Sequence, residues 1–381
     1  MRNGKIDQKL LSAIAAMSRE RKLPCFVFGR DFERTKRHLQ KQNIHIINEY
    51  LFINSFFCAL TQKEIFALSD VQVVDYISSC ANVCTQMYVS KKILSVDKTG
   101  LTGEGVCVAF IDTGISAHPD FLIGRNRIKF FKDFIDDRLD AYDDNGHGTF
   151  VAGVCAGCGA MSSFKFSGIA PKVDIVSLKA LNADGESGAN KILSAMEWVY
   201  DNFKKYNIKV VCMSFGSEPI GVNDPIMIGA EALWREGVTV VAAAGNSGPE
   251  YQTIKSPGIS PKIITVGGID DNRYDNFRYN PNFFEIADFS SRGPAFKKMK
   301  PDLVAPSVDI VSCGIEKPYV TLSGTSVATP MIAGLVCLML EKDKNLSPDV
   351  IKNNLLKSCN PLGFEMNLEG FGMPNLSRLF N

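Results

Sequence analysis

The sequence predicts an α/β domain with a mainly parallel sheet, preceded by a small α+β domain. After residue 100, short runs of apolar residues recur along the chain, which is typical of strands buried on both faces. Helical patterns separate these runs, as in proteins whose helices cover a parallel sheet. Before residue 80, the order of elements is strand, helix, two strands, helix and strand, which indicates a split βαβ unit. A chain of 381 residues also suits two domains.

We expect three segments along the chain. Residues 1–22 would form a helical extension, residues 23–85 the small split βαβ (ferredoxin-like) domain, and residues 86–381 the α/β domain. In the small domain, Thr61 and Glu64 have capping-box spacing, which predicts a helix start. The expected strands there are 25–28, 44–47, 52–60 and 71–76, and the expected helices are 31–42 and 65–68.

The larger domain shows the pattern of a parallel sheet most clearly. Its expected strands are 106–111, 173–178, 210–214, 238–244 and 263–266, and its expected helices are 148–158, 188–206 and 223–236. The apolar run 327–340 is shorter than a membrane span and contains Pro330, so it predicts a buried core helix. Functional residues gather at the carboxyl ends of strands in such sheets.

Composition argues against several classes of function. The net charge is +1, so no strong field would attract nucleic acid or an anionic membrane. The eleven cysteines are odd in number and irregularly spaced, which favours free thiols and a reducing, cytoplasmic location. Cys155 and Cys158 have C-x-x-C spacing, but no second pair or histidine pair completes a metal site. We therefore expect no nucleic-acid partner, no membrane and no bound metal.

Four polar residues stand where acyl-transfer chemistry could be assembled. Asp112 and Asn246 each follow an apolar strand, whereas His147 and Ser326 each begin a helix. Histidine is the usual general base near neutral pH, and an amide N–H can bind an oxyanion. Taken singly, each residue has a simpler explanation as a helix cap or a turn. Together, in the order Asp, His, Asn, Ser, they indicate acyl transfer through a serine nucleophile.

The segments around these residues resemble the signatures of the subtilisin-like serine peptidases (subtilases). The matching segments are 108–114 (VAFIDTG), 145–149 (NGHGT) and 323–330 (SGTSVATP), and 244–246 (AGN) resembles the oxyanion segment of that family. The resemblance covers about residue 95 to the C-terminus. It implies a three-layer subtilisin-like domain and a serine endopeptidase that cleaves polypeptides through an acyl-enzyme. Val327 stands where the family usually has Met, and we expect little effect because both are apolar.

The resemblance also implies a role for each site residue. Ser326 would be the nucleophile, His147 the general base and then acid, and Asp112 the group that orients the imidazole. The side chain of Asn246 and the backbone N–H of Ser326 would bind the oxyanion. Residues of two segments would hold the substrate: Ser214, Phe215 and Gly216 by pairing with its backbone, and Ala243, Ala244 and Gly245 as the facing wall of the specificity pocket.

Three charged residues are candidates for substrate specificity. Lys255 lies near the expected base of the specificity pocket. Its ammonium group could favour an acidic or polar side chain at P1, the residue before the scissile bond, or could extend into solvent. Asp143 and Asp144 precede the histidine and could favour a basic residue at P2, one position earlier in the substrate.

The first 80 or so residues resemble the inhibitor-type propeptide of subtilases in the order of their elements. Such a propeptide assists folding and then inhibits the enzyme as a product would, so we expect self-cleavage between about Ser78 and Ser90. Asp120 matches one calcium ligand of many secreted members, but the loop that supplies the other ligands is missing. No cofactor is therefore expected to be required. Without a clean signal-peptide cleavage site, the chain looks most like the intracellular, calcium-independent bacterial subtilases.

Two other functions remain open. A catalytically silent subtilase-like binding or regulatory protein would be expected if one of the four positions held Ala or Gly, but all four hold competent residues. An α/β-hydrolase esterase would carry Gly-x-Ser-x-Gly with its acid and histidine after the serine. Here Asp112 and His147 both precede Ser326.

Overall fold

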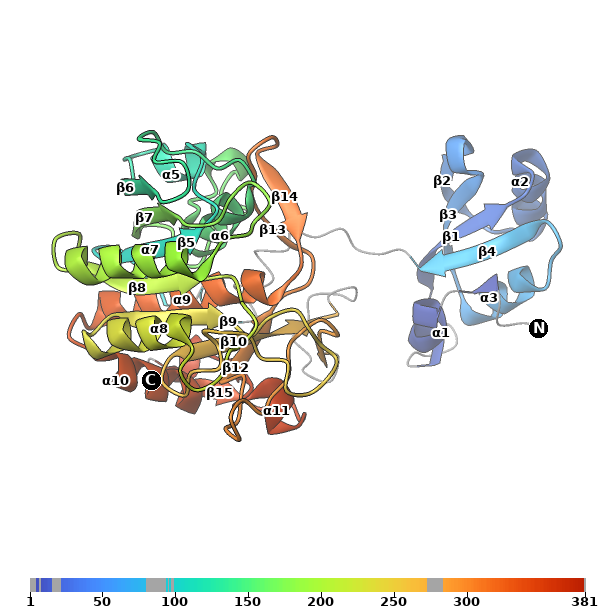
Figure 1. Ribbon diagram of the computed structural model, residues 1–381. Coiled ribbons are helices and arrows are strands. Elements are labelled where there is room, and N and C mark those ends of the chain that lie inside the picture. Colours follow the sequence, from blue (N-terminus) through green and yellow to red (C-terminus); the bar gives the residue numbers. More distant parts are fainter. Residues whose placement is uncertain are drawn as a thin grey trace. The chain divides into compact units, whose positions relative to one another are not determined.

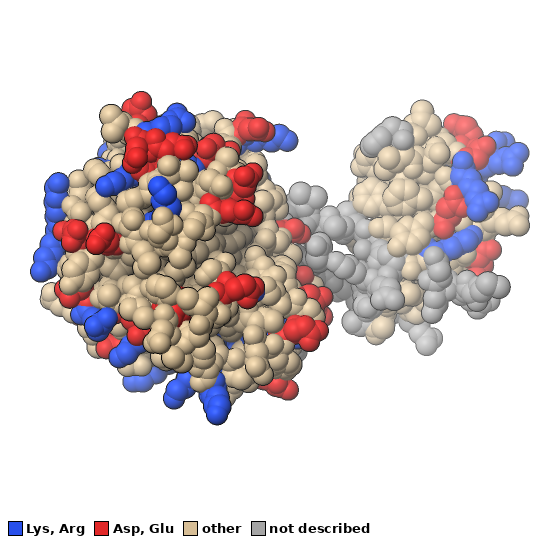
Figure 2. Space-filling view, viewed as in Figure 1, with Lys and Arg blue, Asp and Glu red and all other residues tan. Residues whose placement is uncertain are grey.

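The computed structural model describes residues 5, 6, 8–15, 22–79, 94, 96, 99–272 and 284–379. The chain divides into two compact units, residues 1–83 and residues 84–381. The predicted cleavage range therefore begins at the end of the last described strand of the first unit, and its residues 80–90 lie outside the described residues. Figure 2 shows acidic and basic side chains mixed over the visible face of the larger unit, in keeping with the net charge of +1.

The N-terminal unit is an antiparallel sheet of strand order β2-β3-β1-β4 with its helices packed against it (Figure 1). This order confirms the split βαβ prediction. The strands are β1 (Leu23–Gly29), β2 (Ile46–Tyr50), β3 (Ser55–Leu60) and β4 (Val74–Ser79), and the helices are α1 (Gln8–Ala15), α2 (Phe32–Lys41), the 3-10 turn η2 (Leu51–Ile53) and α3 (Gln62–Ser69). The predicted capping box is present, because Thr61 and Glu64 bond each other's backbone N–H groups.

Burial alternates along β1, so that Cys25 and Val27 face the core of this unit. Helix α1 contributes Leu10 and Ile14 to the same core. The structure therefore places the helical segment expected within residues 1–22 inside the N-terminal unit rather than apart from it, since one apolar face of α1 is buried there. It also ends that unit at Val83, two residues before the expected boundary.

The other face of this sheet carries partly exposed aromatic side chains. The Phe26 ring centroid lies 5.8 Å from that of Tyr50 and 5.1 Å from that of Phe57, and the Phe28 and Tyr76 centroids are 6.5 Å apart. Tyr76 is 40% exposed. Contiguous exposed apolar surface of this kind often marks an interaction site.

The C-terminal unit is built on an eight-stranded sheet that is parallel except where β11 pairs with β10. Its order is β11-β10-β9-β8-β5-β7-β6, with β12 also paired to β10. The strands are β5 (Cys107–Asp112), β6 (Ile128–Asp133), β7 (Asp174–Lys179), β8 (Ile208–Met213), β9 (Thr239–Ala243), β10 (Ile264–Asp270), β11 (Glu285–Ile286) and β12 (Leu303–Pro306). The successive strands β7 and β8 lie on opposite sides of β5, so β5 marks the switch point at which such sheets bind ligands.

Helices cover both faces of this sheet, which confirms the three-layer α/β prediction. Helices α7 (Ala189–Asn202) and α8 (Pro225–Arg235) lie side by side over one face, and α6 (His147–Ala156) and α9 (Thr325–Lys342) pack against the other (Figure 1). The remaining elements are α5 (Pro119–Leu122), the 3-10 turn η4 (Ala160–Ser162), α10 (Pro348–Ser358), α11 (Met366–Glu369), α12 (Leu376–Leu379) and the two-stranded pairs β13 (Ile310–Cys313) with β14 (Tyr319–Leu322) and β15 (Cys359–Asn360) with β16 (Met373–Pro374).

Helix α9 is the central helix of the core. Every residue from Val327 to Leu340 is buried, as the apolar run predicts. The helix has 18 residues, because it begins two residues earlier and ends two residues later than that run. Length and composition alone would allow it to cross a membrane, but 83% of its apolar window is buried inside the unit. Its role in the fold is to hold Ser326, its second residue, on a rigid support.

Candidate active site

Asp112 and His147 are brought together by the end of β5 and the start of α6. The Nδ1 atom of His147 lies 2.8 Å from the Oδ1 atom of Asp112. Asp112 is buried, and its Oδ1 also accepts a hydrogen bond from the N–H of Thr113. Its Oδ2 is buried and has no hydrogen-bond partner among the described residues. The bond to Oδ1 leaves Nε2 as the ring nitrogen of His147 available for proton transfer.

Close backbone packing explains why these two elements meet. A Cβ atom at Gly148, the second residue of α6, would collide with the carbonyl oxygen of Gly114. Glycine therefore allows α6 to start directly against the chain that leaves β5. The N–H of Gly148 also donates to the hydroxyl oxygen of Thr113, 2.8 Å away. These contacts set the position of His147 relative to Asp112.

Asp143 holds the turn before α6. Its Oδ1 accepts hydrogen bonds from the hydroxyl of Thr113 and from the N–H groups of Asn145 and Gly146. Its Oδ2 accepts from the N–H and the hydroxyl of Thr149. Asp143 is buried and both oxygens of its carboxylate are engaged by these five donors within the protein. The structure does not support the expectation that it selects a basic P2 residue, because the turn already uses its hydrogen-bonding capacity.

Asp144 is likewise paired within the protein. Its Oδ1 lies 2.6 Å from the ammonium nitrogen of Lys179, whose side chain is fully buried. The same nitrogen donates to the carbonyl oxygens of Thr113 and Leu181. Lys179 thus ties the chain after β5, the turn before α6 and the segment after β7 to one another. A P2 role for Asp144 would have to compete with this buried cation, so the structure does not support it.

The environment of His147 raises its pKa. Burial alone would lower the pKa, because it disfavours the charged ring. The negative charge of Asp112, the hydrogen bond to it and the charge of Asp143 outweigh that effect, and the pKa lies above its ordinary value. These neighbours therefore stabilise the protonated form of the His147 ring.

Ser326 and Asn246 face a common point at the start of α9. A Cβ atom built on Gly324 would lie 3.1 Å from Oγ of Ser326 and 3.2 Å from Nδ2 of Asn246, so any side chain at position 324 would enter this space. The Oδ1 atom of Asn246 accepts hydrogen bonds from the N–H and the hydroxyl of Thr325, both at 2.9 Å. These two bonds orient the amide and leave its NH₂ group facing the space beside Ser326.

A cavity of about 230 Å³ adjoins these two side chains. Most of the residues expected to bind substrate line it: Ser214, Phe215, Gly216, Ala243, Gly245 and Asn246, together with Ser247, Lys255, Thr325 and Ser326. Ala244 is not among its lining, because its side chain packs with Ile254 and Ile259 in a small apolar cluster. Residues 214–216 follow the last paired residue of β8.

Not every predicted partner is in contact. Among the residues that the structure describes, no hydrogen bond joins His147 to Ser326. Catalytic hydrogen bonds are often long in proteins without substrate, so this does not argue against their acting together. Lys255 does not extend freely into solvent, since its ammonium group contacts Glu218.

Three polar residues of the site escaped the sequence analysis: Thr113, Lys179 and Thr325. Lys179 ends an apolar strand and could have been singled out on that basis, because a charged residue in a buried strand needs a partner. Thr113 and Thr325 adjoin Asp112 and Ser326 in sequence, but nothing in a single sequence reveals what their hydroxyl groups bond.

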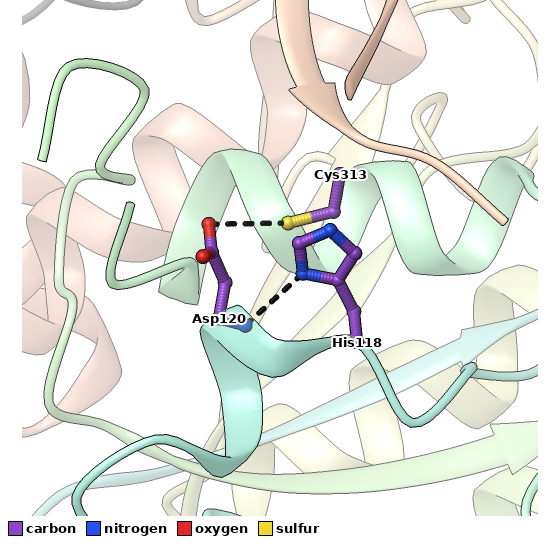
Figure 3. A group of neighbouring side chains, drawn as sticks. All are labelled: His118, Asp120 and Cys313. Atoms are coloured by element: carbon purple, nitrogen blue, oxygen red, sulfur yellow. Dashed lines mark hydrogen bonds between the residues drawn. The ribbon is translucent and has the colours of Figure 1, made fainter. Parts of the chain in front are cut away.

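A calcium ion does not fit the surroundings of Asp120. The buried carboxylate accepts hydrogen bonds from the N–H groups of Gly159 and Met161 and from the hydroxyl of Tyr319, at 3.0, 3.1 and 2.8 Å. The thiol sulfur of Cys313 lies 3.7 Å from Oδ2 of Asp120, the oxygen that also accepts from Gly159 and Tyr319 (Figure 3). Calcium binds roughly six to eight oxygen ligands, whereas the groups that surround the Asp120 carboxylate are hydrogen-bond donors.

The cluster of His118, Asp120 and Cys313 in Figure 3 is also closed to a transition metal, although its ligand atoms lie within 4.8 Å of one another. The Nδ1 atom of His118 accepts the N–H of Asp120, and its Nε2 lies 2.8 Å from the carbonyl oxygen of Pro318. Burial, followed by the charge of Asp120, raises the pKa of Cys313 well above its ordinary value, which keeps the thiol protonated. The cluster is a hydrogen-bond network that joins α5 to β13 and β14.

Comparison with known proteins places this chain in a family. Residues 103–373 match the family described as the Subtilase family. The chain is 38% identical over 308 residues to "Serine protease AprX" of Bacillus subtilis (strain 168), covering 74% of this chain and 67% of that protein. It is 32% identical over 343 residues to "M-protease" of Shouchella clausii (strain KSM-K16), covering 88% and 82%.

Solved structures agree with these sequence matches. "Sphericase" is 27% identical with a TM-score of 0.65, over 77% of this chain and 100% of that one. "S41 Psychrophilic Protease" is 28% identical with a TM-score of 0.65, over 78% and 100%. The fold, the strand-exit and helix-start placement of the site residues, and these matches lead to one conclusion: the chain belongs to the subtilase family and is a serine endopeptidase.

Proposed function

We propose that Asp112, His147 and Ser326 are the catalytic triad of this endopeptidase. The observation that carries the proposal is the 2.8 Å contact between His147 Nδ1 and Asp112 Oδ1. It is supported by the placement of Ser326 beside Asn246 at the cavity of about 230 Å³. The alternative of a silent binding protein has no comparable support, because each position keeps a chemically competent side chain in a suitable environment.

The reaction follows from the roles of these atoms. Nε2 of His147 takes the hydroxyl proton as Oγ of Ser326 forms a bond to the scissile carbonyl carbon. The imidazolium then gives that proton to the leaving amine as the peptide C–N bond breaks, which leaves an acyl-enzyme. Water, deprotonated by His147, hydrolyses the ester and restores Ser326. Asp112 stabilises the imidazolium in both steps, in keeping with the raised pKa of His147.

We assign the oxyanion site to the NH₂ group of Asn246 and the backbone N–H of Ser326. The bonds from Thr325 to Oδ1 of Asn246 orient the amide before substrate arrives. The N–H of Ser326 lies in the first turn of α9, where backbone N–H groups have no partner within the helix and the helix dipole favours negative charge. Such preorganised donors stabilise the charge that develops on the carbonyl oxygen.

A serine-directed fluorophosphonate tests the triad directly. The purified protein should be labelled on Ser326, and Ser326→Ala should neither be labelled nor cleave a casein substrate. Ser323→Ala is a matched control that should keep both labelling and activity. Ser323 is exposed and precedes the same helix, and its hydroxyl accepts the backbone N–H of Asp309, which has no role in the proposed reaction. If the protein without these substitutions is not labelled even after its N-terminal unit is removed, the silent alternative would be favoured.

We further propose that the N-terminal unit is an inhibitory propeptide removed by self-cleavage. Its independent core and its partly exposed aromatic face support a segment that folds by itself and binds another surface. Mass spectrometry of the purified protein should show loss of about the first 80 to 90 residues, whereas Ser326→Ala should keep its full mass. A stable full-length protein with undiminished activity would contradict this proposal.

We also propose that the enzyme works inside the cell. Nine cysteines of the described residues form no disulfide bond, and eight of them are buried, which suits a reducing compartment. Fractionation of cells that produce the protein, followed by immunoblotting, should find it in the cytoplasmic fraction. Recovery mainly from the culture medium would be evidence against this location.

A further inference from the structure

The cavity beside Ser326 contains a charged side chain whose position the backbone determines. Lys255 is the one charged residue among the described residues that line this cavity. Its N–H donates to the carbonyl oxygen of Ala244, and the next residue, Ser256, exchanges two backbone hydrogen bonds with Ser217. The backbone of residues 255–256 is therefore tied to both walls of the cavity.

The side chain of Lys255 is packed between these walls. A Cβ atom built on Gly216 would lie 2.5 Å from Cβ of Lys255, and one built on Gly245 would lie 2.5 Å from its Cγ. Both positions must therefore be glycine for the lysine stem to pass between them. Such tight packing leaves the stem little freedom to swing out of the cavity wall.

The ammonium group of Lys255 is paired with Glu218, and the two side chains differ in their exposure to solvent. It contacts the carboxylate of Glu218, yet the side chain of Lys255 is only 15% exposed while that of Glu218 is 82% exposed. The cation is thus held in place, whereas its partner lies at the surface and can turn into water at small energetic cost. Lys255 thus brings a positive charge to this cavity, and its counterion, Glu218, is replaceable and is not among the residues that line the cavity.

We propose that Lys255 makes the enzyme favour substrates with a carboxylate side chain at P1, and that this carboxylate displaces Glu218. The inference rests on the proposed function, because the cavity receives the P1 side chain only if Ser326 attacks the adjacent carbonyl. A glutamate at P1 would pair with Lys255 in a site that excludes more water than the surface does, where the attraction between opposite charges is stronger. A lysine at P1 would meet a like charge and be disfavoured.

Four peptides that differ only at P1, with Glu, Gln, Met or Lys, test this selectivity through kcat/KM. The unmodified enzyme should cleave the Glu peptide about tenfold faster than the Lys peptide, a difference of about 1.4 kcal/mol. Lys255→Met keeps a stem of similar shape without the charge, so it should abolish this preference for the Glu peptide over the Lys peptide. Raising the salt concentration should weaken the preference of the unmodified enzyme.

Glu218→Gln separates displacement of a counterion from simple charge attraction. Removing the competing carboxylate should raise kcat/KM for the Glu peptide about threefold relative to the Gln peptide. Glu236→Gln, at an exposed position at the end of α8, is the matched control and should leave the ratio unchanged. An unchanged Glu-to-Lys ratio in Lys255→Met, or a lower Glu-to-Gln ratio in Glu218→Gln, would overturn the proposal.

The two proposals fail in different ways. An enzyme that is labelled on Ser326 and cleaves all four peptides equally would overturn the P1 inference alone. A protein that cleaves none of them and is not labelled would overturn the proposed function and this inference with it.

Discussion

The imidazole of His147 and the carboxylate of Asp112 meet 2.8 Å apart, although 35 residues separate them in the chain. The side chain of His147 is 26% exposed, whereas the carboxylate of Asp112 is buried. The histidine that accepts the proton therefore reaches the surface, and the carboxylate that stabilises its charge does not. This relationship allows direct predictions about the dependence of the enzyme on pH and on each partner.

Asp112→Asn should reduce kcat by roughly ten-thousandfold, because an amide neither stabilises the imidazolium nor holds the correct tautomer. In the unmodified enzyme, kcat/KM should rise with pH through a pKa above the ordinary histidine value of about 6.5. In Asp112→Asn, this rising limb of the pH profile should move to lower pH, since the negative charge that raises the pKa of His147 is gone. Measurement of kcat/KM against pH for both proteins would show this, and an unmoved limb would contradict it.

The raised pKa of His147 should also affect stability, with a definite sign. A histidine whose pKa is higher in the folded state stabilises the protein most at low pH, and this contribution disappears as the pH rises through the folded-state pKa. In an inactive Ser326→Ala background, which avoids self-digestion, His147→Gln should therefore lower Tm more at about pH 6 than at about pH 9. Differential scanning calorimetry at the two values would measure it. A larger loss at the higher pH would show that the assigned cause is wrong.

Asn246→Ala should lower kcat by roughly a hundred- to a thousandfold with little change in KM, the size of loss known from subtilisin for its oxyanion amide. The reason is that its NH₂ group would bond the oxygen only after charge develops on it. Thr325→Val should give a smaller loss, because it removes one of the two bonds that orient the amide and leaves the backbone N–H bond in place. Steady-state kinetics on one peptide would separate the two effects. A change confined to KM would argue against the assignment.

Asp143→Asn should destabilise the protein by about 2–3 kcal/mol, because an amide cannot accept the five hydrogen bonds that the buried carboxylate accepts. Selectivity at P2 should remain unchanged. Urea unfolding of Asp143→Asn in the inactive Ser326→Ala background would measure the loss of stability. A P2 peptide series on Asp143→Asn in the active enzyme would measure the selectivity. Loss of a preference for basic P2 residues without loss of stability would restore the specificity role that the sequence suggested.

We propose that no calcium ion is needed at Asp120, where hydrogen-bond donors surround the carboxylate. Excess EGTA should therefore leave Tm and activity unchanged. Tyr319→Phe should lower the free energy of unfolding by about 1–2 kcal/mol, because it removes one donor from this partly buried network. A fall in Tm with EGTA that added calcium reverses would contradict the proposal.

Much of the fold could be read from local patterns in the chain. The apolar runs of β5, β7, β8, β9 and β10 predicted buried strands because each is long enough to cross a sheet and is rich in Val, Ile and other apolar residues. Strand β6 (Ile128–Asp133) was missed, since Lys129 and Lys132 interrupt its apolar pattern at the edge of the sheet. An edge strand buries less of its length, so its sequence is less constrained.

Local sequence was enough to predict the fold class and to point to four candidate site residues, Asp112, His147, Asn246 and Ser326. These predictions depend on periodicity and on short segments whose order along the chain carries the information. The roles of the charged neighbours emerged from the folded chain alone: Asp143 caps a turn, Asp144 pairs with Lys179, and Lys255 pairs with Glu218. A charge acts through the partner that it meets in space, and these ion-pair partners lie 35 or 37 residues apart in the chain, so the local sequence does not specify that they meet.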